Sequence, residues 1–186
     1  MNLDLFSVPF FIGNIDLKRI KLEVEMGTAF TSETPSSYCE KNLLDPESEK
    51  YLMKVLVDLL GEKFSHFSVV LMSIWRNEYL NNGFQEPHVH IGSKFSFIIY
   101  EKVVTPHTIF YNPAKYLLDA TFGDELTRYH TRQFTPSVRK GQLILFPSYI
   151  EHMVNKNSDQ VTISGNIDFK HHNFPNSNTE SQQKET

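Results

Sequence analysis

The feature that most constrains the fold is the change in the pattern of apolar and turn residues after Gly61. From there on the chain consists of short apolar segments separated by turn residues, and no helical pattern alternates with them. These segments span residues 64–76, 94–104, 107–111, 131–135, 142–146 and 160–169. Several short strands with turn punctuation are typical of a β-sandwich or barrel, whereas a doubly wound parallel sheet needs a helix between successive strands. The sequence therefore predicts a mainly β fold of the α+β class.

The N-terminal third of the chain predicts elements that flank this core. Residues 5–13 predict a strand at a sheet edge, because Pro9 lacks the N–H that an interior strand needs. Residues 14–25 carry apolar residues at helical spacing and predict a helix, and residues 27–44 predict a polar surface loop. Residues 45–61 predict a second helix, because an aspartate and a proline stand at its start and a glycine at its end.

Composition excludes several classes of protein. A chain of 186 residues suits one domain, which we expect at residues 1–170, with a disordered polar tail at 171–186. The net charge of -4 and the lack of a basic face argue against a nucleic-acid partner. Cys39 is the only cysteine, so no internal disulfide can form, which fits a cytoplasmic location. We expect no membrane partner, because no apolar run reaches about 18 residues; the formation of a homodimer stays open.

Three histidines form the strongest chemical signal. His88 and His90 precede the apolar run "FSFIIY", and on a strand two residues spaced in this way point to the same face. His152 follows the apolar segment "LILFP", and a jelly roll can bring an imidazole from such a later strand to the same point. Neutral imidazoles bind Fe, Zn, Cu or Ni. We therefore predict a metal site at these histidines; the alternative is that they are hydrogen-bonded histidines of the core or rim.

Four segments resemble the double-stranded β-helix (jelly-roll or cupin-like) core of the 2-oxoglutarate/Fe(II)-dependent oxygenases, in particular their phage and bacterial branch: "EPHVH", "FSFIIY", "GQLILFPSYIEHMV" and "VTISGN". With "LFSVPFFIG" and "SIWRN", the resemblance covers residues 3 to about 169 and implies such a core with flanking N-terminal helices. His88 and His152 match the two histidines of the family. His90 stands where most of the superfamily carries Asp or Glu, and Glu86 is a second candidate for the third ligand.

The resemblance also implies a binding site for the co-substrate. The arginine that pairs with the distal carboxylate of 2-oxoglutarate in the family corresponds to Gln160 here. We expect Lys102 to supply the cation in its place. Tyr100, Thr162 and Ser164 are expected to add hydroxyl hydrogen bonds to the carboxylate of the keto acid.

Three functional interpretations stay open. The first is an Fe(II)- and 2-oxoglutarate-dependent dioxygenase that uses dioxygen to hydroxylate a substrate, either a small molecule or a side chain, which the sequence does not identify. The second is a cupin-like three-histidine metalloenzyme without 2-oxoglutarate, which Gln160 favours. The third is a non-catalytic jelly-roll binding protein. The nearly complete run of family segments favours the first, and the segments at 27–44 and 112–130 are expected to select the substrate.

Overall fold

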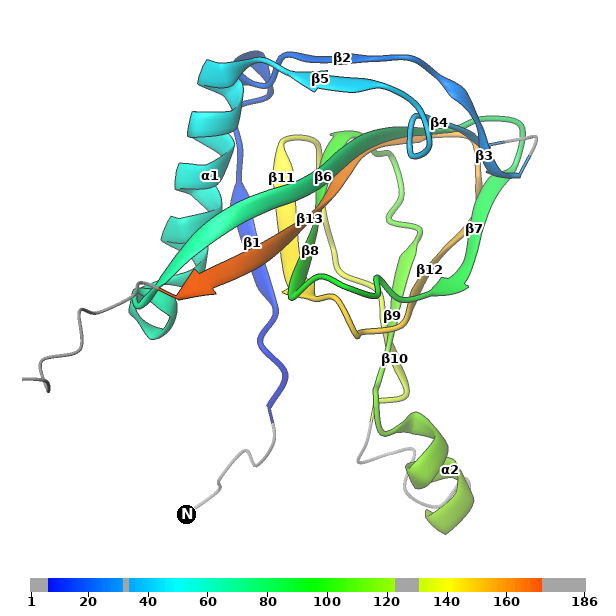
Figure 1. The fold of residues 1–186 in the computed structure, drawn as a ribbon. Coiled ribbons are helices and arrows are strands. Elements are labelled where there is room, and N and C mark those ends of the chain that lie inside the picture. The colour runs from blue at the N-terminus through cyan, green and yellow to red at the C-terminus, as the bar shows by residue number, and fades with distance from the viewer. Residues whose placement is uncertain (1–6, 32–33, 123–130, 172–186) are drawn as a thin grey trace, which may run out of the picture.

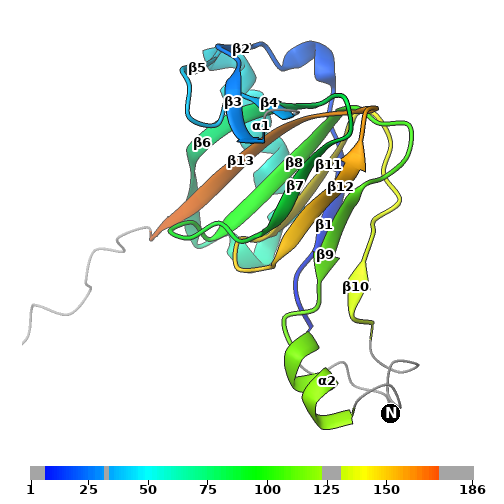
Figure 2. The ribbon, with the colours of Figure 1, turned by 90° about the vertical axis from the view of Figure 1, so that its right-hand side faces the viewer.

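The computed structural model describes residues 7–31, 34–122 and 131–171, which fold into two facing sheets. The larger sheet has seven strands in the order β1 (Phe11–Asn14), β11 (Gln142–Pro147), β8 (Phe95–Lys102), β13 (Gln160–His171), β6 (Phe67–Tyr79), β4 (Thr34–Ser36) and β3 (Gly27–Thr31). The smaller sheet has the order β10 (Gln133–Phe134), β9 (Thr108–Tyr111), β12 (His152–Asn157) and β7 (Gly83–His88). Neighbouring strands pair antiparallel, and the two sheets close into a jelly roll (Figures 1 and 2).

The larger sheet is buried on both faces, which explains the continuous apolar character of β8. Successive side chains of a strand point to opposite faces. Phe97 and Ile99 pack on one face in a core that also holds Leu52 of helix α1 (Pro46–Leu60). Ile98 and Tyr100 pack on the other face, in a second core between the sheets. The helix therefore closes the outer face of the sheet and leaves the inner face for the site.

Helix α1 confirms the helix predicted at residues 45–61. The side chain of Asp45 accepts a hydrogen bond from the backbone N–H of Ser48, and Pro46 occupies the first turn. Gly61 ends the helix with a φ of 67°, a conformation that favours glycine. A single 3₁₀ turn, Glu62–Phe64, follows before β6.

The helix predicted at residues 14–25 is wrong. This stretch forms one 3₁₀ turn, Leu17–Arg19, followed by strand β2 (Leu22–Val24), which pairs with β5 (Asn42–Leu44). The turn closes because the carboxylate of Asp16 accepts a hydrogen bond from the backbone N–H of Lys18. Leu17 and Ile20, two of the apolar residues at helical spacing, instead pack against the core that also holds Leu52 of α1.

The surface loop predicted at residues 27–44 is also wrong, because this segment contains β3, β4 and β5. Three of its polar side chains, those of Thr34, Ser36 and Ser37, are buried. The hydroxyl of Thr34 accepts a hydrogen bond from the backbone N–H of Phe84, and the hydroxyl of Ser36 donates to Asn77. Because this segment is rich in polar residues, the sequence analysis did not predict the strands that form this edge of the larger sheet.

The predicted strands lie at the positions of observed strands, but several of them begin or end at other residues. Each of the six segments after Gly61 contains a strand, but β7 and β12 were not predicted as strands. The N-terminal strand starts at Phe11, after Pro9, and lies at the sheet edge as expected. The segment 112–130, which is expected to help select the substrate, contains helix α2 (Lys115–Phe122), and this helix projects away from the sheets (Figure 2). Residues 123–130 lie outside the described residues.

The last described strand ends near the C-terminus of the chain. Strand β13 extends to His171, and the remainder of the predicted tail lies outside the described residues. Within the described part of the chain, no helix has the length and apolar character needed to span a membrane.

Gly165 on β13 gives the first testable prediction, on stability. A Cβ at this position would lie 2.4 Å from Cζ of Phe97 and 2.6 Å from the backbone oxygen of Ser73. Phe97 is fully buried and cannot move aside. Gly165→Ala should therefore lower the free energy of unfolding by about 1–3 kcal/mol, whereas exposed Lys170→Ala on the same strand should change it by less than about 0.5 kcal/mol. Urea denaturation measures both; equal effects would contradict this packing.

Candidate metal centre

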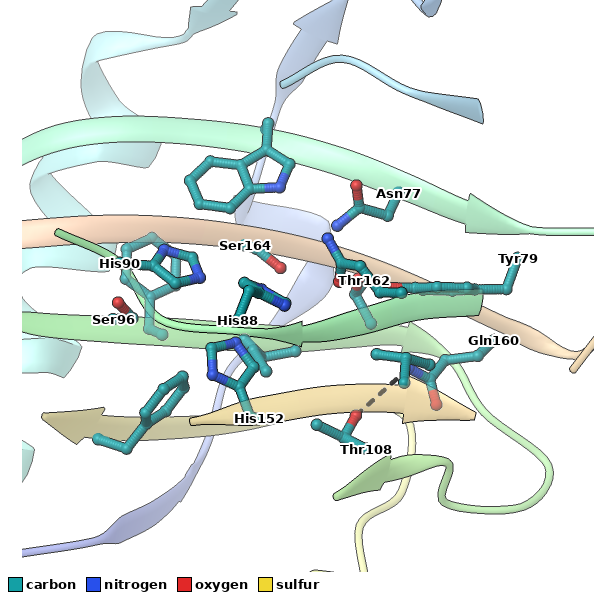
Figure 3. A pocket seen from close by; sticks show the side chains of 16 residues that line it. Asn77, Tyr79, His88, His90, Ser96, Thr108, His152, Gln160, Thr162 and Ser164 are labelled. Atoms are coloured by element: carbon teal, nitrogen blue, oxygen red, sulfur yellow. Dashed lines mark hydrogen bonds between the residues drawn. The ribbon is translucent and has the colours of Figure 1, made fainter. Parts of the chain in front are cut away.

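His88, His90 and His152 come together at one end of the space between the sheets (Figure 3). Their candidate ligand nitrogens all lie within 4.8 Å of one another. The rings of His88 and His152 are closest, with centroids 4.2 Å apart, because these residues are direct partners where β7 pairs with β12. Antiparallel pairing thus joins two histidines that are far apart in the sequence.

His90 reaches the cluster by a different route from the one predicted. Strand β7 ends at His88, and His90 lies in the turn that follows. Its backbone N–H donates to the carbonyl of Ser148, 2.9 Å away, and its ring contacts the side chain of Asn166. The two-residue spacing was therefore a useful signal, although its assumed cause, a shared strand face, is wrong for His90.

The hydrogen bonds of the rings set which nitrogen carries the proton. Nδ1 of His88 and Nδ1 of His152 lie 2.7 and 2.9 Å from the backbone carbonyl two residues earlier. Nδ1 of His90 lies 2.8 Å from Oδ1 of Asn166. Because an oxygen acceptor needs a donor, Nδ1 carries the proton in each ring, and a neutral ring then has its lone pair on Nε2.

The surroundings of Nε2 of His90 indicate whether these residues fit a metal ion. It is buried, and no hydrogen-bond partner for it exists among the described residues. A buried acceptor without a donor is unfavourable, whereas a neutral imidazole nitrogen directed at two others suits a divalent transition metal. The donor set therefore fits Fe(II).

Burial keeps the three imidazoles neutral. It lowers the pKa of His88, and it lowers the pKa of His90 to about 4, with a further contribution from the nearby His88. Burial, together with the other two rings, holds the pKa of His152 well below its usual range. Since a metal binds the unprotonated ring, the site is ready for a metal at neutral pH.

Asn166 of β13 orients the ring of His90, and other hydrogen bonds determine which way the Asn166 amide points. Its Oδ1 also accepts a hydrogen bond from the hydroxyl of Ser96 at 2.8 Å, and its Nδ2 donates to the hydroxyl of Ser73 at 3.0 Å. The hydroxyl of Ser148 lies 2.8 Å from that of Ser96 and extends the network. The amide oxygen therefore faces the His90 ring from a fixed direction.

Glu86, the alternative third ligand, does not join the cluster. Its side chain is exposed on the rim, and the only group of potential ligands found in the described residues consists of the three histidines. Within this geometry His90 is the third donor.

A narrow inner pocket runs from the histidines to Gln160 (Figure 3). Gln160, Thr162 and Ser164 line it as expected, since alternate residues of β13 share one face. Tyr100 lies behind the wall and donates to the hydroxyl of Thr108 at 3.0 Å. The free space is about 10 Å³, room for about one water, so a larger ligand enters only if lining side chains rotate.

Lys102 does not reach this pocket. It is the last residue of β8, beyond a register shift at Val161 and Thr162, and it is exposed. The sequence analysis also missed several polar residues of the pocket: Asn77, Tyr79, Gln85 and Thr108. The alternation of Trp75, Asn77 and Tyr79 along β6 is the signal that would have identified the first two.

A wider cavity of about 470 Å³ opens on the outer side of the histidines. Half of its lining residues are aromatic or apolar, namely Tyr38, Trp75, Pro87, Val89 and Ile91, and the polar half consists of the two histidines with Gln85, Glu86 and Asn166. Since His88, His90 and Trp75 line both spaces, a metal ion at the histidines would lie between the narrow inner pocket and the wide outer cavity.

Comparison with known families gives one match to a sequence model. Residues 73–166, about half of the chain and all three histidines, match the family described as "Putative 2OG-Fe(II) oxygenase". Comparison with curated proteins finds no match.

Three solved structures share the fold at low sequence identity. An oxidoreductase of the 2OG-Fe(II) oxygenase family from Burkholderia pseudomallei has a TM-score of 0.54 and 12% identity, covering 78% of this chain and 72% of its own. HygX from Streptomyces hygroscopicus, with nickel, 2-oxoglutarate and hygromycin B bound, has a TM-score of 0.54 and 10% identity over 87% and 83%. The non-heme alpha-ketoglutarate-dependent epimerase SnoN from nogalamycin biosynthesis has a TM-score of 0.53 and 13% identity over 77% and 66%.

The lowered pKa values predict a loss of stability in acid. Between the ordinary imidazole pKa of about 6.5 and the lowered values, the unfolded chain binds more protons than the folded metal-free protein. The free energy of unfolding should therefore fall as the pH drops below about 6.5. Urea denaturation of chelator-treated protein at about pH 7.5 and about pH 5 measures this. His90→Gln should reduce the pH dependence and exposed His66→Gln should not; an unchanged dependence in His90→Gln would contradict the assignment.

The Asn166 network predicts an effect on metal affinity. Asn166→Ala removes the acceptor for Nδ1–H of His90 and should weaken Fe(II) binding about 10–100-fold, measured by competition with a chelator. Asn166→Asp keeps that acceptor and should retain most of the affinity. Ser73→Ala, which removes only the partner of Nδ2, is the matched control. Wild-type affinity in Asn166→Ala would exclude this role.

Proposed function

This chain belongs to the family described as "Putative 2OG-Fe(II) oxygenase", and we propose that it is a hydroxylase that uses Fe(II), 2-oxoglutarate and dioxygen. The family uses Fe(II) and 2-oxoglutarate, and the chain is an oxidoreductase. The observation that carries the proposal is the convergence of three neutral imidazoles, with candidate ligand nitrogens within 4.8 Å of one another. Bound together, Fe(II), 2-oxoglutarate and dioxygen supply the oxidising power that converts a C–H bond into C–OH.

His88, His90 and His152 would hold the iron. Three protein ligands leave coordination positions for small molecules. The proton on each Nδ1 fixes the ring orientation, so the Nε2 lone pairs converge without competing protonation. The absence of a carboxylate from this set leaves the charge of the metal to be balanced by bound anionic ligands, which favours a keto-acid carboxylate at the open positions.

Aromatic rings shield the histidines from water. The indole of Trp75 stacks on His90, with ring centroids 5.6 Å apart, and Phe110 stacks on His152 at the same separation. The ring of Phe146 meets His152 edge-on, with centroids 4.9 Å apart. Exclusion of water strengthens the interactions of charges with the site and limits side reactions of a bound oxidant.

The outer cavity is the part of the site that fits a substrate. Its volume of about 470 Å³ suits a small organic molecule, and His88 and His90 are among the residues that line it. HygX, whose structure has nickel, 2-oxoglutarate and hygromycin B bound, supports a small-molecule substrate by analogy of fold. Exposed Cys39 fits a reducing compartment, and we place the protein in the cytoplasm on that ground.

One observation favours a second candidate function, the cupin-like metalloenzyme without 2-oxoglutarate. Neither Lys nor Arg occurs among the described residues that line the inner pocket, so no cation is present for the distal carboxylate of 2-oxoglutarate. SnoN is an epimerase, which also shows that this fold alone does not determine the outcome of the reaction.

Anaerobic titration with Fe(II), with and without 2-oxoglutarate, tests the proposal. Chelation of the iron by the keto acid should give a weak visible charge-transfer band that requires both components. The band should disappear in His88→Ala and His152→Ala because each substitution removes an iron ligand. Glu86→Gln, at the exposed rim, is the control and should keep it. Iron binding without the band in the wild-type protein would favour the second candidate.

A further inference from the structure

The far end of the inner pocket contains a buried amide with an unused acceptor. Gln160 is 1% exposed, and its Nε2 donates to the hydroxyl of Thr108 over 3.5 Å, the limit of a hydrogen bond. Its Oε1 is buried without a hydrogen-bond partner among the described residues. A ligand that donates a proton to this oxygen would remove an unfavourable contact, whereas an anion would add one.

Among the described residues that line the pocket, no cation offsets an anion at this end. The basic side chains of the neighbouring strands point elsewhere: Arg76 pairs with Glu78 and Glu101, and Lys102 is exposed. Residues of β6 alternate between the two faces of the sheet, so that Tyr79 faces the pocket while Arg76 lies on the opposite face. A carboxylate beside Gln160 would therefore be buried without a charged partner.

The tyrosines around Gln160 also disfavour negative charge. Burial raises the pKa of Tyr79 and of Tyr100 far above the usual range, because the phenolate is poorly stabilised there. Both hydroxyl protons are already used: Tyr79 donates to Oε1 of Gln85 and Tyr100 to Thr108, each over 3.0 Å. These hydroxyls therefore cannot replace a cation without losing bonds that they already make.

We propose that this end of the pocket selects a 2-oxo acid with a neutral far end that carries an N–H donor, such as a carboxamide, over one with a carboxylate. This selection rests on the iron-dependent hydroxylase function proposed above and replaces its co-substrate, 2-oxoglutarate, with a 2-oxo acid whose far end is neutral. A primary amide matches the side chain of Gln160 reciprocally: its N–H donates to Oε1, and its carbonyl accepts from Nε2. A carboxylate can accept from Nε2 but sets its second oxygen against Oε1.

A matched pair of unreactive probes tests this selection. N-oxalylglycine and N-oxalylglycinamide share the metal-chelating oxalyl group and differ only in the far end, a carboxylate in one and a carboxamide in the other. Calorimetric titration of each probe into the anaerobic Fe(II)-loaded protein should give about tenfold tighter binding for the amide, the effect of one buried hydrogen bond. Equal or tighter binding of N-oxalylglycine would overturn the inference.

Variants at Gln160 connect the preference to this side chain. Gln160→Arg should reverse it, because the guanidinium pairs with a carboxylate, and Gln160→Met should abolish it. Gln160 lies at the opposite end of the pocket from the histidines, so both variants should still bind one Fe(II), which reports on their fold. Binding of both probes with the carboxylate preferred would leave the hydroxylase proposal intact and refute only the selection. Binding of neither probe to the iron-loaded wild-type protein would refute both.

Discussion

The site depends on the position of strand β13 in the middle of the larger sheet. It pairs with β6 along its whole length and with β8 over its first half, and this double pairing fixes which of its residues face the inner pocket. Gln160 lies at the far end of the inner pocket, and Asn166, six residues further along the same strand, contacts the ring of His90. Gly165 has no side chain because Phe97 occupies the space that a Cβ would need. The packing of the core and the geometry of the site are set by the same strand.

Charge is the second constraint on the site. The three imidazoles are held neutral by burial, and the residues that line the inner pocket are uncharged apart from these titratable rings. A dication bound to three neutral nitrogens would be the dominant charge in a space with little solvent. Anionic groups are therefore favoured near the histidines and disfavoured near Gln160. A 2-oxo acid bound along this pocket would therefore need an anionic group at the end near the histidines and a neutral group at the end near Gln160.

The sequence predicted local features well and long-range ones less well. Helix α1 was predictable because its cap, first turn and terminal glycine are neighbours in the sequence. The helix expected at residues 14–25 failed because apolar spacing alone does not exclude a short turn followed by a strand. The buried strands within 27–44 were hidden by polar side chains, among them that of Ser36, whose partner lies on β6.

Within the site, the sequence identified the residue types and missed parts of their arrangement. The approach of His88 to His152 followed from the expectation that a jelly roll brings an imidazole from a later strand to the same point. The position of His90 did not, since it depends on Ser148 and Asn166, which are remote in the sequence. Lys102, at the end of β8, was expected to supply the cation for the co-substrate, but its side chain is exposed and does not line the pocket.

X-ray absorption spectroscopy of the Fe(II)-loaded protein tests the central claim most directly, because it counts the imidazole rings bound to the metal. The account predicts three imidazole ligands in the wild-type protein and two in His90→Ala. Two imidazoles and a carboxylate in the wild-type protein, unchanged by His90→Ala and altered by Glu86→Ala, would contradict it.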